Sequence, residues 1–364
     1  MTIRQALARL SLLLAVAGIS FNVLARTPNA IITAPPQDGP TQVEFSTDQV
    51  SKWTDLPMGT YRVPNSDVII SGHQKGGAAP FLLFGLIGMA VQNGINAQNG
   101  KEAMESAEKA LTFSIDDEAK TKLQAAMADP AYAGKFTSAA TADRKYEITG
   151  AVIMSFASQQ DVLPYVVLRV KLMGGNSKLW TTRYIASSGA RRPLTGDNSW
   201  TANDGALLRP QVSKLLDLAI GTMLTDIATP YPRDEASLTN VHGFFVHVNK
   251  PLQVVGYKLA EHDGRMLFLP NLSTTIVFAG VNILDTATVW QQPAASKDAP
   301  LKLLKPTDPT LVGIISPAAA ATPAAAAPAA AAPAVAAPAA AGDSSTNVPA
   351  ATDDAAAKQD QGGG

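Results

Sequence analysis

The stretch from Pro317 to Ala341 limits where this chain can build a core, because it consists almost entirely of alanine and proline. Each proline removes a backbone donor and clashes with the preceding helical turn. The alanine blocks between the prolines are too short to offset the cost of nucleating a helix. The residues after this stretch are mostly small or polar and have little to bury. We therefore expect residues 293–364 to form a disordered, Ala/Pro-rich tail, which leaves the folded part in front of it.

The beginning of the chain has the three-part pattern of an export signal. Arg4 and Arg9 precede an apolar run from Leu10 to Ile19, and Ala25 provides a small residue at the expected cleavage position. The apolar run is too short to span a bilayer as a helix. We predict a signal peptide over residues 1–25 and a periplasmic or secreted protein, with an uncleaved anchor as the alternative.

Cysteine is missing from the chain, and this excludes several classes of protein. Disulfides, thiolate metal sites, cysteine nucleophiles and the acylated cysteine of a lipoprotein all require that residue. The fold must therefore be stabilised by an ordinary core, for which a chain of 364 residues with 46% hydrophobic residues is sufficient. The net charge of −1, without a basic block, gives no footprint for a phosphate backbone, so we expect no nucleic-acid partner.

An almost uncharged segment follows a loose, proline-containing lead-in over residues 26–75. We predict an apolar helix over residues 80–91, and a helix that is apolar all round must be buried somewhere. It is slightly shorter than a membrane span requires. A core helix, a membrane-inserting segment and a self-association helix remain open as interpretations. The residues expected to contact a membrane or a partner are Phe81, Leu82, Leu83, Phe84, Leu86, Ile87 and Met89.

The periodicity of the remaining chain changes from helix to strand and back. Residues 41–45 and 67–70 are strand-like, and a capping pattern at Ser114 predicts a helix that runs to about Met127. Three β-rich runs within residues 145–187 predict an antiparallel meander. An apolar stripe within residues 201–227 predicts a long amphipathic helix that lies across it.

Short β-rich runs continue after this helix, and Asp263-Gly264 is a tight hairpin signal. The sequence therefore predicts an α+β fold with two folded domains. Residues 76–235 form the first, a three-stranded meander packed by the long helix. Residues 236–292 form the second, a small all-β, barrel-like block.

The order of three strands at 145–187 and a long helix at 201–227 resembles the core of small bacterial envelope proteins. Those proteins act as transport-auxiliary or outer-membrane-assembly components, and they are usually lipoproteins. This chain departs from them because it has no lipobox cysteine. The resemblance implies a non-enzymatic envelope role, with an envelope protein or a membrane surface as the partner.

Residues with catalytic or metal-binding chemistry form no recognisable motif. We expect His242 and His247 to point to opposite faces of one strand, which is poor for chelation. Ser106 and Lys109 match the Ser-x-x-Lys pattern of acyl-enzymes but lack its companion motifs. We predict no cofactor and no metal. Two hypotheses follow, a non-enzymatic exported envelope component and, as the alternative, a secreted or periplasmic hydrolase that uses His242 or His247.

Overall fold

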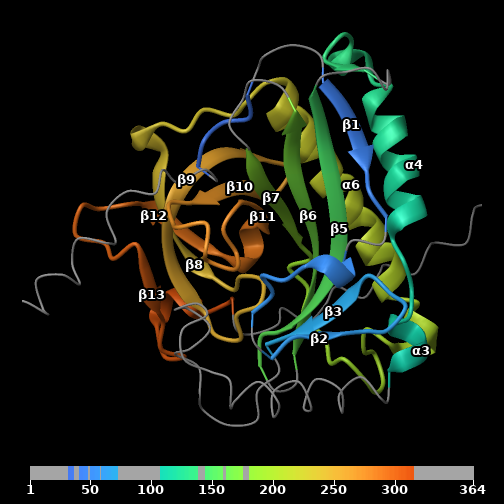
Figure 1. Cartoon of the computed structure of the whole chain (residues 1–364). Coiled ribbons are helices and arrows are strands. Elements are labelled where there is room, and N and C mark those ends of the chain that lie inside the picture. The colour runs from blue at the N-terminus through green and yellow to red at the C-terminus, as the bar shows by residue number, and fades with distance from the viewer. Residues whose placement is uncertain are drawn as a thin grey trace, which may run out of the picture. The chain divides into compact units, whose positions relative to one another are not determined.

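The computed structural model consists of two units, residues 1–320 and 321–364, and all the residues it describes lie in the first unit. The described residues are 32–36, 41–47, 50–57, 59–72, 107–137, 144–158, 161–174 and 180–314. Figure 1 shows this part of the chain, with most of the strands and helices labelled.

One mixed sheet of 13 strands organises the described residues. Its main path runs in the order β12-β8-β9-β10-β11-β7-β6-β5-β1-β4, while β13 pairs with β9, and β3 pairs with β2 and β5. The strand bounds are β1 Thr41–Phe45, β2 Tyr61–Arg62, β3 Val68–Ser71, β4 Phe136–Thr137, β5 Arg144–Phe156, β6 Val162–Gly174, β7 Thr181–Ser187, β8 Leu238–Gly243, β9 Leu252–His262, β10 Arg265–Pro270, β11 Val281–Asp285, β12 Trp290–Pro293 and β13 Leu301–Leu303.

The antiparallel strands β5, β6 and β7 form the centre of the sheet, in register from Arg144↔Gly174 to Phe156↔Val162 between β5 and β6. Their sequences are rich in valine, isoleucine and tyrosine, which suit a pleated surface that is buried on both faces. Both β5 and β6 are 13 residues long, so the central hairpin is longer than a typical strand pair. It gives the rest of the chain a platform with two faces.

Helices cover one face of this platform. The helix bounds are α3 Glu108–Leu111, α4 Asp116–Met127, α5 Ala202–Gly205 and α6 Leu208–Ala228. The stripe of α6 packs on β6 and β7, and α4 packs against α6 and β1 (Figure 1). The buried apolar residues of α6 include Val212, Leu215, Leu216, Ala219 and Met223, as the helical periodicity predicts.

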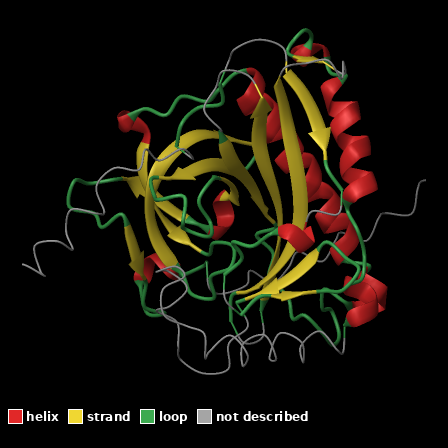
Figure 2. Cartoon of the chain, in the orientation of Figure 1, coloured by secondary structure: helices red, strands yellow, loops and turns green. Residues whose placement is uncertain are grey.

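The second half of the sheet curves over the opposite face of the platform. Phe245, Phe268 and Phe278 are fully buried or nearly so, and they share a core with Ile153 and Tyr165 of the central hairpin. Figure 2 shows the two longest helices on one side of the central strands and the curved strands on the other. The central hairpin therefore separates two hydrophobic cores.

The predicted fold class, a small meander with a helix followed by a separate barrel-like block, is wrong. β11 pairs in parallel with β7, with Val281 opposite Tyr184, and this joins the later strands to the central ones in one sheet. β1 and β3 also add to β5 in parallel from the lead-in. Parallel pairs join segments that are distant in sequence, so no local pattern marks them. The residues predicted as tail also contribute, because β13 pairs with β9 and Leu311 is buried.

Two local sequence signals, the hairpin at Asp263-Gly264 and the helix start at Ser114, can be compared with the structure. Asp263 and Gly264 both have positive φ and link β9 to β10, which confirms the predicted hairpin. The helix predicted at Ser114 exists as α4, and the Ser114 hydroxyl oxygen accepts a hydrogen bond from the backbone N–H of Asp116 (3.1 Å), but a second residue from outside the helix shares in the cap. Asp67, next to β3, accepts hydrogen bonds from the backbone N–H of Ile115 (2.9 Å) and from the Ser114 hydroxyl (2.6 Å). Among the helices of the described residues, none has the length and hydropathy to cross a membrane.

Candidate functional site

The residues predicted to contact a membrane or a partner, Phe81, Leu82, Leu83, Phe84, Leu86, Ile87 and Met89, lie outside the described residues. Ser106 lies outside them as well, whereas the exposed Lys109 forms an ion pair with Asp204 (3.0 Å). The apolar helix predicted over residues 80–91 therefore stays a prediction.

A charged cluster interrupts the face of the platform that the curved strands cover. Arg169 of β6 and Arg183 of β7 lie directly opposite each other in the antiparallel register. Arg169 lies two residues after Val167 and Arg183 two residues before Ile185, and both of these apolar residues belong to the buried core on that face. Two like charges in this position destabilise a sheet unless a counter-charge lies between them.

Asp55 is that counter-charge, and it comes from a loop rather than from the sheet. Its Oδ1 lies 2.6 Å from Nη1 of Arg169 and its Oδ2 lies 2.8 Å from Nη2 of Arg183. Burial alone would raise the pKa of Asp55, but the two arginines lower it below its ordinary value. The Asp55 side chain is 46% exposed, against 22% for Arg169 and 15% for Arg183. The cluster thus opens to solvent on the side of Asp55.

A third arginine, Arg62, lies close to this cluster. Arg62 donates a hydrogen bond to the carbonyl of Trp53, and its charge helps to lower the pKa of Arg169. Burial is the main cause of that change, which takes the pKa of Arg169 to about 10. The charge of this third arginine thus acts on Arg169, whereas Arg169 and Arg183 share the carboxylate of Asp55.

Two donors of the cluster are buried without an acceptor among the described residues. The guanidinium carbon of Arg169 lies 3.6 Å from the centre of the Trp53 ring, a cation–π contact. The Nε of Arg169 and the Nε1 of Trp53 have no hydrogen-bond partner there. A buried donor without an acceptor costs free energy, and native proteins contain few of them.

Arg183 is held in place independently of Asp55. Its Nη1 donates to the carbonyls of Ile276 and Ala279, both at 3.3 Å. The chain can pass this close only because residue 280 is glycine. Gly280 has a φ of +126°, and a Cβ there would lie 2.4 Å from the carbonyl oxygen of Arg183.

His247 lies on the same side of the sheet, beyond the end of β8 and not on that strand as the sequence predicted. Its Nδ1 is 2.8 Å from the hydroxyl of Ser71, and its backbone N–H donates to Ser155. Burial, assisted by the charges of Arg183 and Arg169, lowers the pKa of His247 to about 3. The imidazole is therefore neutral at physiological pH.

His242, on β8, has different neighbours. Its Nδ1 lies 2.6 Å from the hydroxyl of Thr310, which donates to Asp308, and its ring stacks on Trp290. Its Nε2 is buried without a partner among the described residues, and burial lowers its pKa. Each histidine is thus bonded to a hydroxyl group of its own. Within the described part of the chain, no group of three or more histidine and carboxylate side chains is placed to hold a metal ion.

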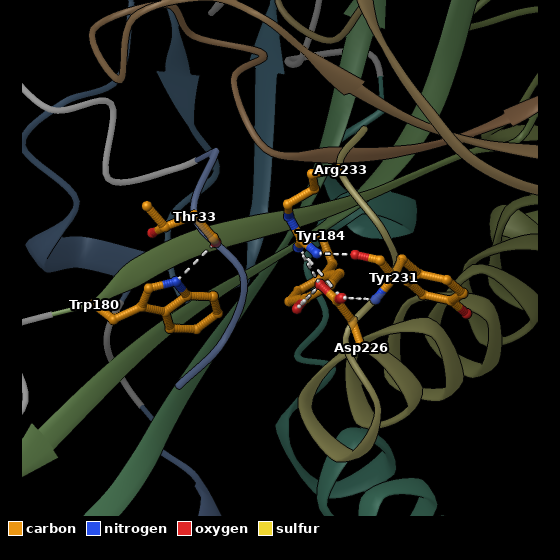
Figure 3. A network of polar contacts seen from close by, with 6 residues as sticks. All are labelled: Thr33, Trp180, Tyr184, Asp226, Tyr231 and Arg233. Atoms are coloured by element: carbon orange, nitrogen blue, oxygen red, sulfur yellow. Dashed lines mark hydrogen bonds and ion pairs between the residues drawn. The ribbon is translucent and has the colours of Figure 1, made fainter. Parts of the chain in front are cut away.

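A second ionic cluster, shown in Figure 3, surrounds the buried Asp226 and joins the end of α6 to β7. Asp226 has no solvent exposure and accepts hydrogen bonds from the Tyr184 hydroxyl (2.9 Å), Arg233 (2.9 Å) and the backbone N–H of Tyr231 (3.0 Å). Arg233 also donates to the Tyr231 carbonyl. Because both carboxylate oxygens are occupied inside the protein, this cluster is suited to structural support rather than to ligand binding.

Sequence reasoning missed both ionic clusters. Asp55, Arg169 and Arg183 belong to three separate segments, and nothing in the sequence pairs them. One signal was present in β6, where Arg169 follows the largely apolar run Val162–Leu168. A charged residue at an inward position of a buried strand is rare unless it is paired.

Comparison with known proteins gives little further guidance. No family model matches the chain, and no curated protein matches it. Among solved structures, part of the chain is similar to a protein from Xanthomonas campestris described under the family model DUF330. The two are 16% identical with a TM-score of 0.20, over 31% of this chain and 57% of that protein. The chain thus spans little more than half of that protein, and a TM-score this low does not establish a shared fold.

Proposed function

We propose that this protein is a non-enzymatic, exported component of the cell envelope that acts by binding, as an assembly, transport-auxiliary or interaction protein. The observation that carries the proposal is the arginine cluster at Asp55. Two facing arginines share one half-exposed carboxylate there, and paired guanidinium groups suit recognition of an anionic group.

The two ends of the sequence support an extracytoplasmic location. Residues 1–25 have the pattern of an export signal, and the Ala/Pro-rich stretch after Pro317 resembles a semi-extended spacer. In this proposal the residues Phe81 to Met89 attach the protein to a membrane or to an envelope protein. Self-association through the same residues is the alternative.

Cell fractionation tests the location and the attachment together. The full chain, tagged at its C-terminus, is expressed with and without residues 1–25 and separated into cytoplasm, periplasm, membrane and medium. We expect the full chain outside the cytoplasm and its signal-deleted form inside. Deletion of residues 81–89 is expected to move the protein from the membrane fraction to the soluble one, with an unchanged urea unfolding curve. Cytoplasmic retention of the full chain would contradict the proposal.

The alternative function, a secreted or periplasmic hydrolase, has one observation in its favour. Nδ1 of His242 contacts the Thr310 hydroxyl, which donates to Asp308, so a carboxylate-linked group orients the ring from Nδ1, the nitrogen that the carboxylate holds in a catalytic triad. This hypothesis predicts ester or amide hydrolysis that is lost in His242→Gln. Wild type and this variant are compared on a panel of chromogenic esters and amides. Equal activity of the two proteins would exclude the hydrolase hypothesis.

A further inference from the structure

We propose that the Arg169–Arg183 pair is a binding site for an external oxyanion, a carboxylate or phosphate group, and that Asp55 is the internal competitor for this site. This inference rests on the proposed binding function and names the chemistry that the arginine cluster recognises. The geometry of Asp55 shows what fits, since its two oxygens bridge the two guanidinium groups at 2.6 and 2.8 Å. An external group with two anionic oxygens can make the same pair of contacts.

The arginines are preorganised and the carboxylate is not. Arg183 is fixed by the carbonyls of Ile276 and Ala279, and Arg169 is fixed against the ring of Trp53. Both arginines extend from paired strands, whereas Asp55 belongs to the irregular segment after Lys52. Asp55 can therefore leave the pair while the arginines stay in place.

The loop itself is anchored at a different residue. Trp53 is only 4% exposed and belongs to the core, while Asp55, two residues later, is half-exposed. Rotation of the Asp55 side chain into solvent would thus not require Trp53 to leave the core. It would leave the two facing arginines without the Asp55 carboxylate between them.

Unused hydrogen-bond donors indicate that Asp55 does not satisfy this site. Nε of Arg169 and Nε1 of Trp53 are buried without an acceptor among the described residues, and they belong to one stacked pair of side chains. A site built only to hold the loop would be expected to satisfy its own buried donors. Both oxygens of Asp55 are already engaged by the two arginines. The oxygens of a bound external oxyanion would offer further acceptor positions to Nε of Arg169 and Nε1 of Trp53.

The experiment compares anion binding in the full chain with and without the competitor. Wild type, Asp55→Asn and Asp55→Asn/Arg169→Gln are titrated with sodium acetate and with inorganic phosphate at constant ionic strength. Binding is followed by calorimetry and by the shift in thermal unfolding temperature. Asp217→Asn is the control, because it also removes an ion-paired carboxylate, but one on α6 whose partner is the single cation Lys122.

We expect Asp55→Asn to bind at least one of the two probes about ten-fold more tightly than wild type, since a tethered competitor acts at high effective concentration. Asp217→Asn should bind as wild type does, and the added Arg169→Gln should abolish the gain. The tighter probe identifies the ligand group as carboxylate or phosphate. Equal binding by wild type and Asp55→Asn, or a gain that survives Arg169→Gln, would overturn the proposal.

A second measurement covers the case in which Asp55→Asn does not fold. Wild type alone is titrated with each probe while tryptophan fluorescence is recorded, because Arg169 lies on the Trp53 ring. We expect a saturable change that is lost in Trp53→Phe and in Arg169→Gln. No saturable change in wild type would overturn the proposal. If these titrations succeed while fractionation places the full chain in the cytoplasm, the oxyanion site stands and the envelope function does not.

Discussion

Arg169 and Arg183 face each other across β6 and β7, and a single carboxylate from a distant loop lies between them. The two arginines nevertheless have different surroundings. Arg183 also donates to two backbone carbonyls, whereas Arg169 stacks on Trp53 and keeps an unpaired Nε. Arg183 therefore belongs to the framework of the fold, and Arg169 is the residue with capacity for a ligand.

This difference predicts unequal effects on stability. Arg183→Gln should lower the free energy of unfolding by about 2–3 kcal/mol, because two carbonyls lose their donor. Arg169→Gln should cost roughly 1 kcal/mol, since its ion pair is partly solvated. Urea unfolding of both variants measures the difference, and equal losses would contradict the assigned roles.

Removing the charge of Asp226 should destabilise the fold far more than removing the Tyr184 hydroxyl that donates to it. Asp226→Asn leaves the charge of Arg233 buried without its counter-ion, and the expected loss is about 3–5 kcal/mol. Tyr184→Phe removes one hydrogen bond to the same carboxylate and should cost about 1 kcal/mol. Chemical denaturation of both variants is the measurement. A loss in Asp226→Asn no larger than that in Tyr184→Phe would show that Arg233 finds another partner.

Asp67 should act as the N-terminal cap of α4 from outside the helix. Asp67→Ala removes the acceptor for Ile115 N–H and for the Ser114 hydroxyl, with an expected loss of about 1–2 kcal/mol. Ser114→Ala removes the acceptor for Asp116 N–H but leaves the bond from Ile115 N–H to Asp67 intact, and should cost less. Thermal unfolding of the two variants tests this order, and the reverse order would assign the cap to Ser114.

His247 should make the folded state less stable in acid. Its pKa is about 3 when folded and 6.5 ordinarily, so its contribution is complete above pH 6.5 and is lost as the pH falls towards 3. The slope from this group is at most about 1.4 kcal/mol per pH unit. His247→Asn tolerates the positive φ and should flatten this slope, whereas Ser71→Ala keeps the titrating ring and should not. Urea unfolding at pH values from about 4 to about 8 measures how steeply the free energy of unfolding changes with pH in wild type and in the two variants. Identical slopes in wild type and His247→Asn would contradict the prediction.

Gly280 should not tolerate a side chain. Gly280→Ala places a Cβ against the carbonyl of Arg183 at a backbone angle that L-residues rarely adopt, so we expect a loss of several kcal/mol or failure to fold. Gly264→Ala also has a positive φ but meets open space, and should cost about 1 kcal/mol. Yield and thermal unfolding of the two variants provide the comparison. Similar behaviour of both would mean that the strands separate to accept the side chain.

Local chemistry explains what the sequence by itself determined. The strand at residues 41–45, the helix that ends at Met127, the stripe on α6 and the hairpin at Asp263-Gly264 follow from side-chain periodicity and turn preferences. Each of these signals acts within a few residues. The prediction of export from residues 1–25 is of the same local kind and awaits fractionation.

Tertiary structure alone decided how these elements combine and where the charges meet. The parallel pairing of β11 with β7 made one sheet from what the sequence divided into two domains. The same folding brought Asp55 to two arginines more than a hundred residues away, and Asp67 to the start of α4. Such contacts depend on which distant surfaces pack together, and a hydrophobic pattern records only that a surface is buried, not what covers it.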